Sequence, residues 1–225
     1  MGFLGTWLDG VRIGADRRTI STPEALRDFL SAQASFVAQK VVTEYCQAKA
    51  GRQWTLLSSE QTFIDDLTRS RWEAFAILLG AMFVLAESQI RAAAALSDEA
   101  AGGLVGLYAV ALDAYPRPPH RVGGWDDRVE GFATRLAQAR SVPPATARAI
   151  AEAGGRAVFD VLPIHLNMRR LDGPMVVNAI AFQFAAVAGR MRRRLDVPAL
   201  AAALAGAPGA PAQGAGDWAG RASPS

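Results

Sequence analysis

One run of thirteen residues constrains the fold of this chain more than any other. Residues 74–86, AFAILLGAMFVLA, would be apolar on every side of an α-helix, so that helix must be surrounded by protein or by lipid. At 1.5 Å per residue the run is about 20 Å long, shorter than the roughly 30 Å hydrocarbon layer of a bilayer, and charged residues flank it closely. The run therefore predicts a core helix at the centre of a helical bundle.

An amphipathic helix is predicted before this run. Ser21 and Glu24 have the spacing of a capping box. An apolar stripe at helical spacing then extends from Leu26 to Tyr45, and Gly51 follows as a stop signal. The core run itself is expected in a second helix that begins near residues 58–59.

The next predicted helix begins at Ser97, where acidic residues occupy the first turn, and ends before Pro116. Residues 115–127, YPRPPHRVGGWDD, are rich in proline and glycine, which predicts a loop dividing the helices into two groups. Beyond this loop, Asp127 and Glu130 have capping-box spacing for a short helix.

A further helix is expected to start at Ser141 and to be weakened or kinked by Gly154 and Gly155. No sustained strand pattern or internal repeat is present in the sequence. The fold that we predict is therefore all-α, a single helical bundle of about six main helices in residues 1–205. An Ala/Gly/Pro-rich tail, residues 206–225, is expected to be disordered because it cannot bury enough apolar surface.

A second apolar run lies between two arginine clusters, within residues 168–196. Its seventeen uncharged residues are at the lower limit for a membrane span. Large side chains from Val177 to Met191 recur in steps of three and four, and this stripe continues among the arginines. We expect a core-facing helix in a soluble or peripherally bound protein, with a membrane span as the alternative.

Positive charge is concentrated around this helix. Residues 156–196 contain seven arginines and three aspartates, a net charge of +4, whereas the whole chain carries +3. Arginine binds carboxylates and phosphates, which predicts a binding site for an acidic partner. The structural alternative is a solvated helix end whose cations interact with the helix dipole. The candidate binding residues are Arg169, Arg170, Arg190, Arg192, Arg193 and Arg194.

These features predict a non-enzymatic helical adaptor, a protein-binding chain that docks an acidic partner through its basic C-terminal helix. The expected partner is a protein or another copy of the chain, with an anionic membrane surface as the alternative. Nucleic acid is not expected, because no complete helix-turn-helix, zinc finger or aromatic platform is present. The start MGFLGTWLDG lacks the pattern of a signal peptide, so we expect a cytoplasmic location, with peripheral attachment to the inner membrane as the alternative.

Residues suited to catalysis are few. The signatures GxSxG, SxxK, GxGxxG and HExxH are absent. His165 lies near Asp172 in LPIHLNMRRLDG, where the histidine could act as a base, and these two residues are the catalytic candidates. Cys46 is the only cysteine, so a cysteine zinc cluster is excluded, and we expect no metal and no cofactor.

The run LRDFLSAQASFVAQK, residues 26–40, resembles a poorly characterised family of alphaproteobacterial helical proteins, some of which have carried the label esterase. The resemblance implies an esterase-type hydrolase as the alternative function, with His165 as base and an unidentified serine. The segment SSEQTFIDDLTRSRW, residues 58–72, departs from the pattern of that family, and no catalytic motif of the family is assigned to this chain.

Overall fold

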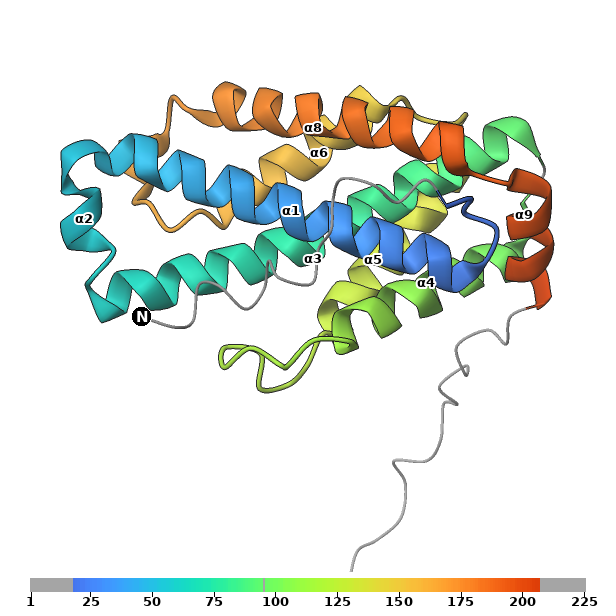
Figure 1. Ribbon diagram of the computed structural model, residues 1–225, viewed down its shortest axis with the longest axis horizontal. Coiled ribbons are helices and arrows are strands. Elements are labelled where there is room, and N and C mark those ends of the chain that lie inside the picture. Colours follow the sequence, from blue (N-terminus) through green and yellow to red (C-terminus); the bar gives the residue numbers. More distant parts are fainter. Residues whose placement is uncertain (1–17, 95, 207–225) are drawn as a thin grey trace, which may run out of the picture.

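The computed structural model describes residues 18–94 and 96–206, and this part of the chain is an all-α bundle, as predicted (Figure 1). Six of its helices have fourteen residues or more. They are α1 (Pro23–Ala50), α3 (Gln61–Ala93), α4 (Asp98–Asp113), α5 (Asp126–Arg140), α6 (Ala147–Asp160) and α8 (Gly173–Arg194). The shorter elements are the 3-10 turn η1 (Gly51–Gln53), α2 (Trp54–Leu57), α7 (Leu166–Arg169) and α9 (Val197–Gly206). The predicted disordered tail lies outside the described residues, apart from Gly206, which ends α9.

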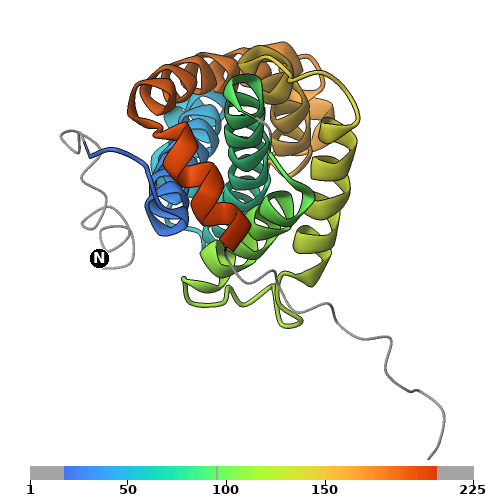
Figure 2. The same ribbon diagram turned by 90° about the vertical axis from the view of Figure 1, so that its right-hand side faces the viewer.

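Helix α3 is the centre of the bundle. It packs against α1, α4, α5, α6, α8 and α9, and these helices surround it in the end view of Figure 2. Residues 74–86 are buried except for Ala81 and Val84, which are partly buried, and Leu79 and Met82 have no exposed surface. The prediction that this run forms the core helix is confirmed.

Two helices, α3 and α8, are long and apolar enough to cross a membrane by length and composition. In α3, 83% of the apolar window is buried inside the bundle, as expected for a core helix. In α8 the buried share is 33%, which corresponds to one side of the helix. The inner side of α8 is formed by Val176, Ile180, Phe184, Val187 and Met191. The stripe predicted from Val177 therefore starts one residue earlier.

Helix α1 shows how local chemistry sets helix ends. Its N-cap is Thr22 rather than the predicted Ser21, and the Thr22 hydroxyl accepts a hydrogen bond from the backbone N–H of Ala25. Pro23 occupies the first turn, where its missing N–H costs nothing. At the other end Gly51 has a φ of 50°, a conformation that favours glycine, so the predicted stop is confirmed.

The start of α4 agrees with the sequence-based prediction, whereas the starts of α5 and α6 differ from it. Ser97 caps α4 as predicted, and its hydroxyl accepts a hydrogen bond from a backbone N–H in the first turn. The capping box predicted for α5 is wrong, because the helix starts after Trp125, which makes no side-chain cap. Helix α6 begins after Thr146 rather than at Ser141, since the two prolines between them disfavour helical backbone in the residues that precede them.

Gly154 and Gly155 lie inside α6, which is continuous from Ala147 to Asp160, and they allow close packing on two sides. A Cβ atom on Gly155 would lie 3.1 Å from the Cα atom of Val177 in α8. A Cβ atom on Gly154 would lie 3.3 Å from the Cβ atom of Ala81 in α3. The glycine pair thus places α6 between the core helix and α8, close to the backbone of α8.

Adding a methyl group at this junction should weaken the fold. We expect Gly155→Ala to lower the free energy of unfolding by about 1–3 kcal/mol, because the new Cβ meets backbone that cannot move aside easily. Gly102 in α4 is the matched control, since a Cβ there meets nothing within 4 Å. Gly102→Ala should raise stability by about 0.5–1 kcal/mol through helix propensity alone. Urea denaturation followed by circular dichroism measures both, and equal effects would contradict the assigned packing.

Candidate functional site

The six candidate arginines do not form one surface. Arg169 is buried, and its guanidinium donates hydrogen bonds to the backbone carbonyls of Ile164, Phe159 and Asp160. It also lies over the ring of Phe159, 4.8 Å from the ring centre. These carbonyls lie at or after the end of α6, where the helix supplies few backbone donors. Arg169 therefore closes the α6–α7 connection and is not available to a partner.

Two more of the candidates are turned toward the bundle. Arg190 is partly buried and donates a hydrogen bond to the side chain of Gln33 in α1. Burial lowers the pKa of Arg190, and the neighbouring cations Arg193 and Arg194 lower it further. Arg194 donates to the carbonyl of Arg18 and lies over the ring of Phe29. Both side chains connect the end of α8 to the start of the described chain.

Arg170, Arg192 and Arg193 are exposed and form no ion pair or hydrogen bond within residues 18–94 and 96–206. Arg170 follows α7, whereas Arg192 and Arg193 lie in the last turn of α8. The only acidic residue between 161 and 195 is Asp172, which is bound to other groups. The available positive charge thus lies at the two ends of one continuous segment.

Exposed apolar side chains lie in the same segment as these charges. The described residues contain nine large apolar side chains that are exposed, and five of them fall in residues 166–182. We name these five the α7–α8 ridge: Leu166, Met168, Leu171, Met175 and Phe182. Leu171 is 82% exposed and Phe182 is 74% exposed. Isolated exposed apolar residues are common on proteins, but a group of five within seventeen residues, near free cations, makes this segment the candidate site of the described part of the chain.

The catalytic candidates His165 and Asp172 are engaged separately. The Nδ1 atom of the exposed His165 accepts a hydrogen bond from the backbone N–H of Asn167 and caps α7, at 3.3 Å. Asp172 accepts from the hydroxyl of Tyr45 at 2.8 Å and pairs with Lys49 at 2.6 Å. These partners hold the pKa of Asp172 below its usual range, while burial and the bond to Asp172 raise the pKa of Tyr45. No hydrogen bond in the described part of the chain links His165 to Asp172.

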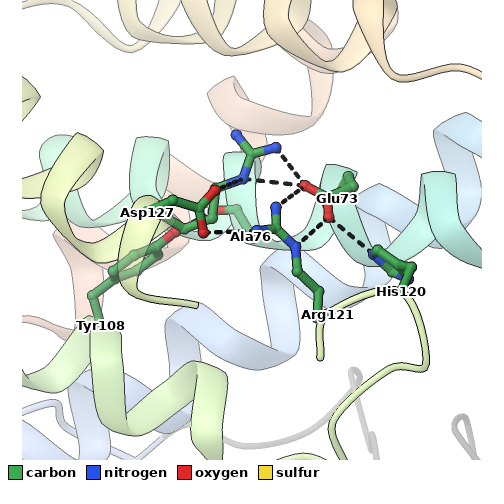
Figure 3. Close-up of polar contacts among 7 residues, drawn as sticks. Glu73, Ala76, Tyr108, His120, Arg121 and Asp127 are labelled. Carbon is green, nitrogen blue, oxygen red and sulfur yellow. Dashed lines mark hydrogen bonds and ion pairs between the residues drawn. The ribbon is translucent and has the colours of Figure 1, made fainter. Parts of the chain in front are cut away.

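A buried carboxylate, which sequence reasoning missed, organises the loop after α4. Glu73 of α3 accepts hydrogen bonds from Arg121 at 2.6 and 2.5 Å, from His120 at 2.9 Å and from Arg128 of α5 (Figure 3). Arg121 also pairs with Asp127 at 2.7 Å and lies over the ring of Trp125. The loop predicted as a divider is therefore held on the core helix. Glu73 directly precedes the apolar run 74–86. A charged residue next to positions that must be buried was the sequence feature from which this cluster could have been predicted.

The charge of Glu73 is stabilised by its partners. Burial disfavours the ionised carboxylate, but the hydrogen bonds from Arg121 and Arg128 outweigh it and lower the pKa of Glu73 to about 2. Every oxygen of the carboxylate is occupied by donors from this chain. The Glu73 cluster consequently serves to fix structure and offers no free group for a substrate.

A second buried carboxylate holds the other end of α5. Glu87, which has no exposed surface, accepts from Arg91 at 2.6 Å and from Arg140 at 3.4 Å. Arg140 also pairs with Asp98 at 2.8 Å and borders a cavity of about 410 Å³ between α4 and α5. Because the two charged groups at this cavity bind each other, it presents mainly apolar walls. No group of three or more His, Cys, Asp or Glu side chains suited to a metal ion occurs among the described residues.

Comparison with known proteins gives no relative from which a function could be inferred. No protein-family model matches the chain, and neither a curated protein nor a solved structure matches it. The arrangement of side chains is therefore the only basis for assigning a function, and the free cations beside the α7–α8 ridge are its most distinctive feature.

Removing the Glu73 charge should destabilise the bundle strongly. We expect Glu73→Gln to lower the free energy of unfolding by about 3 kcal/mol, because Arg121 and Arg128 would be left partly buried without their carboxylate. Asp66→Asn, which changes an exposed carboxylate of the same helix, is the control and should change stability by less than about 0.5 kcal/mol. Urea denaturation at neutral pH measures both, and a loss below about 1 kcal/mol for Glu73→Gln would contradict the assigned role.

The same cluster predicts a pH dependence. The pKa of Glu73 is lowered on folding, so its ionised form contributes stability above the unfolded value of 4.5, and this contribution is lost as the pH falls toward about 2. The difference in unfolding free energy between the parent chain and Glu73→Gln should therefore shrink from pH 5 downward, with pH values chosen about one unit apart. A difference that stays constant between neutral and acidic pH would disprove the ionic role of Glu73.

Proposed function

We propose that this chain is a non-enzymatic helical interaction protein that docks an acidic partner on the outward side of α7 and α8. The observation that supports this most is the position of Arg193. A Cβ atom on Gly189 would lie 3.6 Å from the Arg193 guanidinium, so the Arg193 side chain folds back along the outer side of α8. A free cation thus lies on the same side of the helix as exposed apolar residues.

Helix periodicity places these groups in one line. Met175 and Phe182 are seven residues apart, and Arg193 is eleven residues beyond Phe182. Steps of seven and eleven return to nearly the same side of an α-helix. At 1.5 Å per residue the line is about 27 Å long, which is enough for an extended contact. Arg192 and Arg170 add charge beside this line and at its other end.

The hydrolase alternative has less support than the docking surface. His165 acts as the cap of α7, and Asp172 is bound by Tyr45 and Lys49. A general base needs a group that orients it and a nucleophile within hydrogen-bond reach. His165 has neither among its hydrogen bonds in the described part of the chain.

Site-specific photo-crosslinking tests the docking surface. Phe182 is replaced by p-benzoylphenylalanine, an aromatic residue of similar character, in the full chain expressed in bacterial cells. We expect a defined adduct, with a protein or with a lipid, on irradiation, because the Phe182 side chain is 74% exposed on the outer side of α8. The adduct should disappear in the triple variant Arg170→Gln, Arg192→Gln and Arg193→Gln, and it should weaken as salt rises, since exposed charges are screened over about 8 Å at physiological ionic strength.

Two matched controls make the experiment specific. The crosslinker at Val110, which is 51% exposed, probes an apolar position on α4, a helix that lies apart from α8 in Figure 1. The triple variant Arg52→Gln, Arg69→Gln and Arg135→Gln removes equal charge from exposed positions elsewhere. Similar adducts from positions 110 and 182, or equal losses in the two triple variants, would reject docking through α8.

A further inference from the structure

We propose that the acidic partner is the surface of an anionic phospholipid bilayer, on which the protein lies with α8 parallel to the membrane and the α7–α8 ridge inserted among the headgroups. This inference rests on the proposed function, since it names the partner of the same surface. It depends on three properties of that surface: its apolar side chains are exposed, its helix is buried along one side only, and the free charges within residues 161–195 are all positive.

The α7–α8 ridge projects from the protein. Its five side chains are between 53% and 82% exposed, so each is surrounded by solvent over most of its area. The cavity of about 410 Å³ is formed by α4 and α5 and includes no residue of α7 or α8. A projecting ridge of leucine, methionine and phenylalanine can enter a fluid layer that adapts to its shape, whereas a folded protein would need a preformed groove.

The orientation of α8 follows from its burial. Ile180, Phe184, Val187 and Met191 have no exposed surface and hold the inner side of the helix in the bundle. Crossing a bilayer would require these side chains to leave the core, even though the helix is long enough to span. Attachment along the outer side leaves the core intact. A helix with one apolar side and cations beside it typically lies in the plane of the interface.

The charges favour lipid phosphates over a second copy of the chain. Arg170, Arg192 and Arg193 are free, and Asp172, the only carboxylate between 161 and 195, is occupied by Tyr45 and Lys49. Two copies meeting through residues 161–195 would bring like charges together, because the only carboxylate of that segment is already occupied. Anionic headgroups instead supply phosphate oxygens, which arginine binds with parallel hydrogen bonds.

Vesicle co-sedimentation tests the inference with the full-length chain. The probes are vesicles of phosphatidylcholine alone and vesicles that contain about 30% phosphatidylglycerol, at low salt and at about 0.5 M salt. We expect binding to the anionic vesicles at low salt and little binding to neutral ones. The triple variant R170Q/R192Q/R193Q should bind about 100-fold more weakly, since each surface cation contributes about fivefold. The variant M175S/F182S should lose at least about tenfold, because its apolar insertion is removed.

One control variant matches the loss of charge and another matches the loss of apolar side chains. R52Q/R69Q/R135Q removes the same charge, and V110S/V122S removes two exposed apolar side chains from α4 and the following loop. Both should stay within about threefold of the parent chain, because a difference of that size is below 1 kcal/mol. Circular dichroism confirms folding, which is expected to persist because all substituted residues are exposed.

The outcomes separate this inference from the proposed function. Absence of vesicle binding together with a protein adduct at position 182 would overturn the lipid assignment and leave docking through α8 intact. Absence of both would overturn both proposals. Binding to anionic vesicles that is equally weakened by the control variants would show nonspecific charge attraction and would also overturn the inference.

Discussion

The arrangement of this protein depends on the need to cover α3 from all sides. A helix that is apolar around its circumference is stable in water only when neighbours surround it, and six other helices do so here. Each neighbour contributes one apolar side and would ordinarily present a polar outer side. Helix α8 departs from this rule, because its inner side is fully buried while Met175 and Phe182 remain exposed on its outer side. Packing in the core therefore does not explain the outer residues of α8, which is why we propose a partner for that side of the helix.

Two carboxylates at the ends of the buried part of α3 determine where α5 lies. Glu73 binds Arg128, and Glu87 binds Arg140. The carboxylates are fourteen residues apart and the arginines twelve, so both spacings correspond to about 20 Å along parallel helices. Helix α5 buries only Phe132 and Leu136, too little apolar surface to fix its position firmly. Removing either carboxylate would leave partly buried arginines with only their exposed acidic partners, Asp127 or Asp98, so the two carboxylates fix the position of α5 as well as stabilising the fold.

The sequence predicts those features that depend on one helix at a time. The all-round apolar character of residues 74–86, the cap at Ser97 and the stop at Gly51 were all recognisable, because periodicity and turn chemistry are local. Roles that depend on distant partners were not predictable. Gly155 suggested a kink until Val177 was seen against it, and the adjacent Arg169 and Arg170 have identical local signals. Arg169 is buried against carbonyls of the α6–α7 connection, whereas Arg170 is exposed, and only the fold distinguishes them.

The positions of the free arginines also help to distinguish a role in binding a partner from a role in stabilising α8. Arg192 and Arg193 lie in the last turn of α8, where any cation interacts favourably with the helix dipole, typically by about 0.3–1 kcal/mol. The dipole accounts for positive charge at that end, but it does not require the side chain of Arg193 to fold back over Gly189 toward Phe182. Arg170 lies between the C-terminal end of α7 and the N-terminus of α8, so the dipole of α8 does not account for its charge. The stability of α8 therefore accounts for the cations at its C-terminal end but not for Arg170, and our proposal of an external anion covers both.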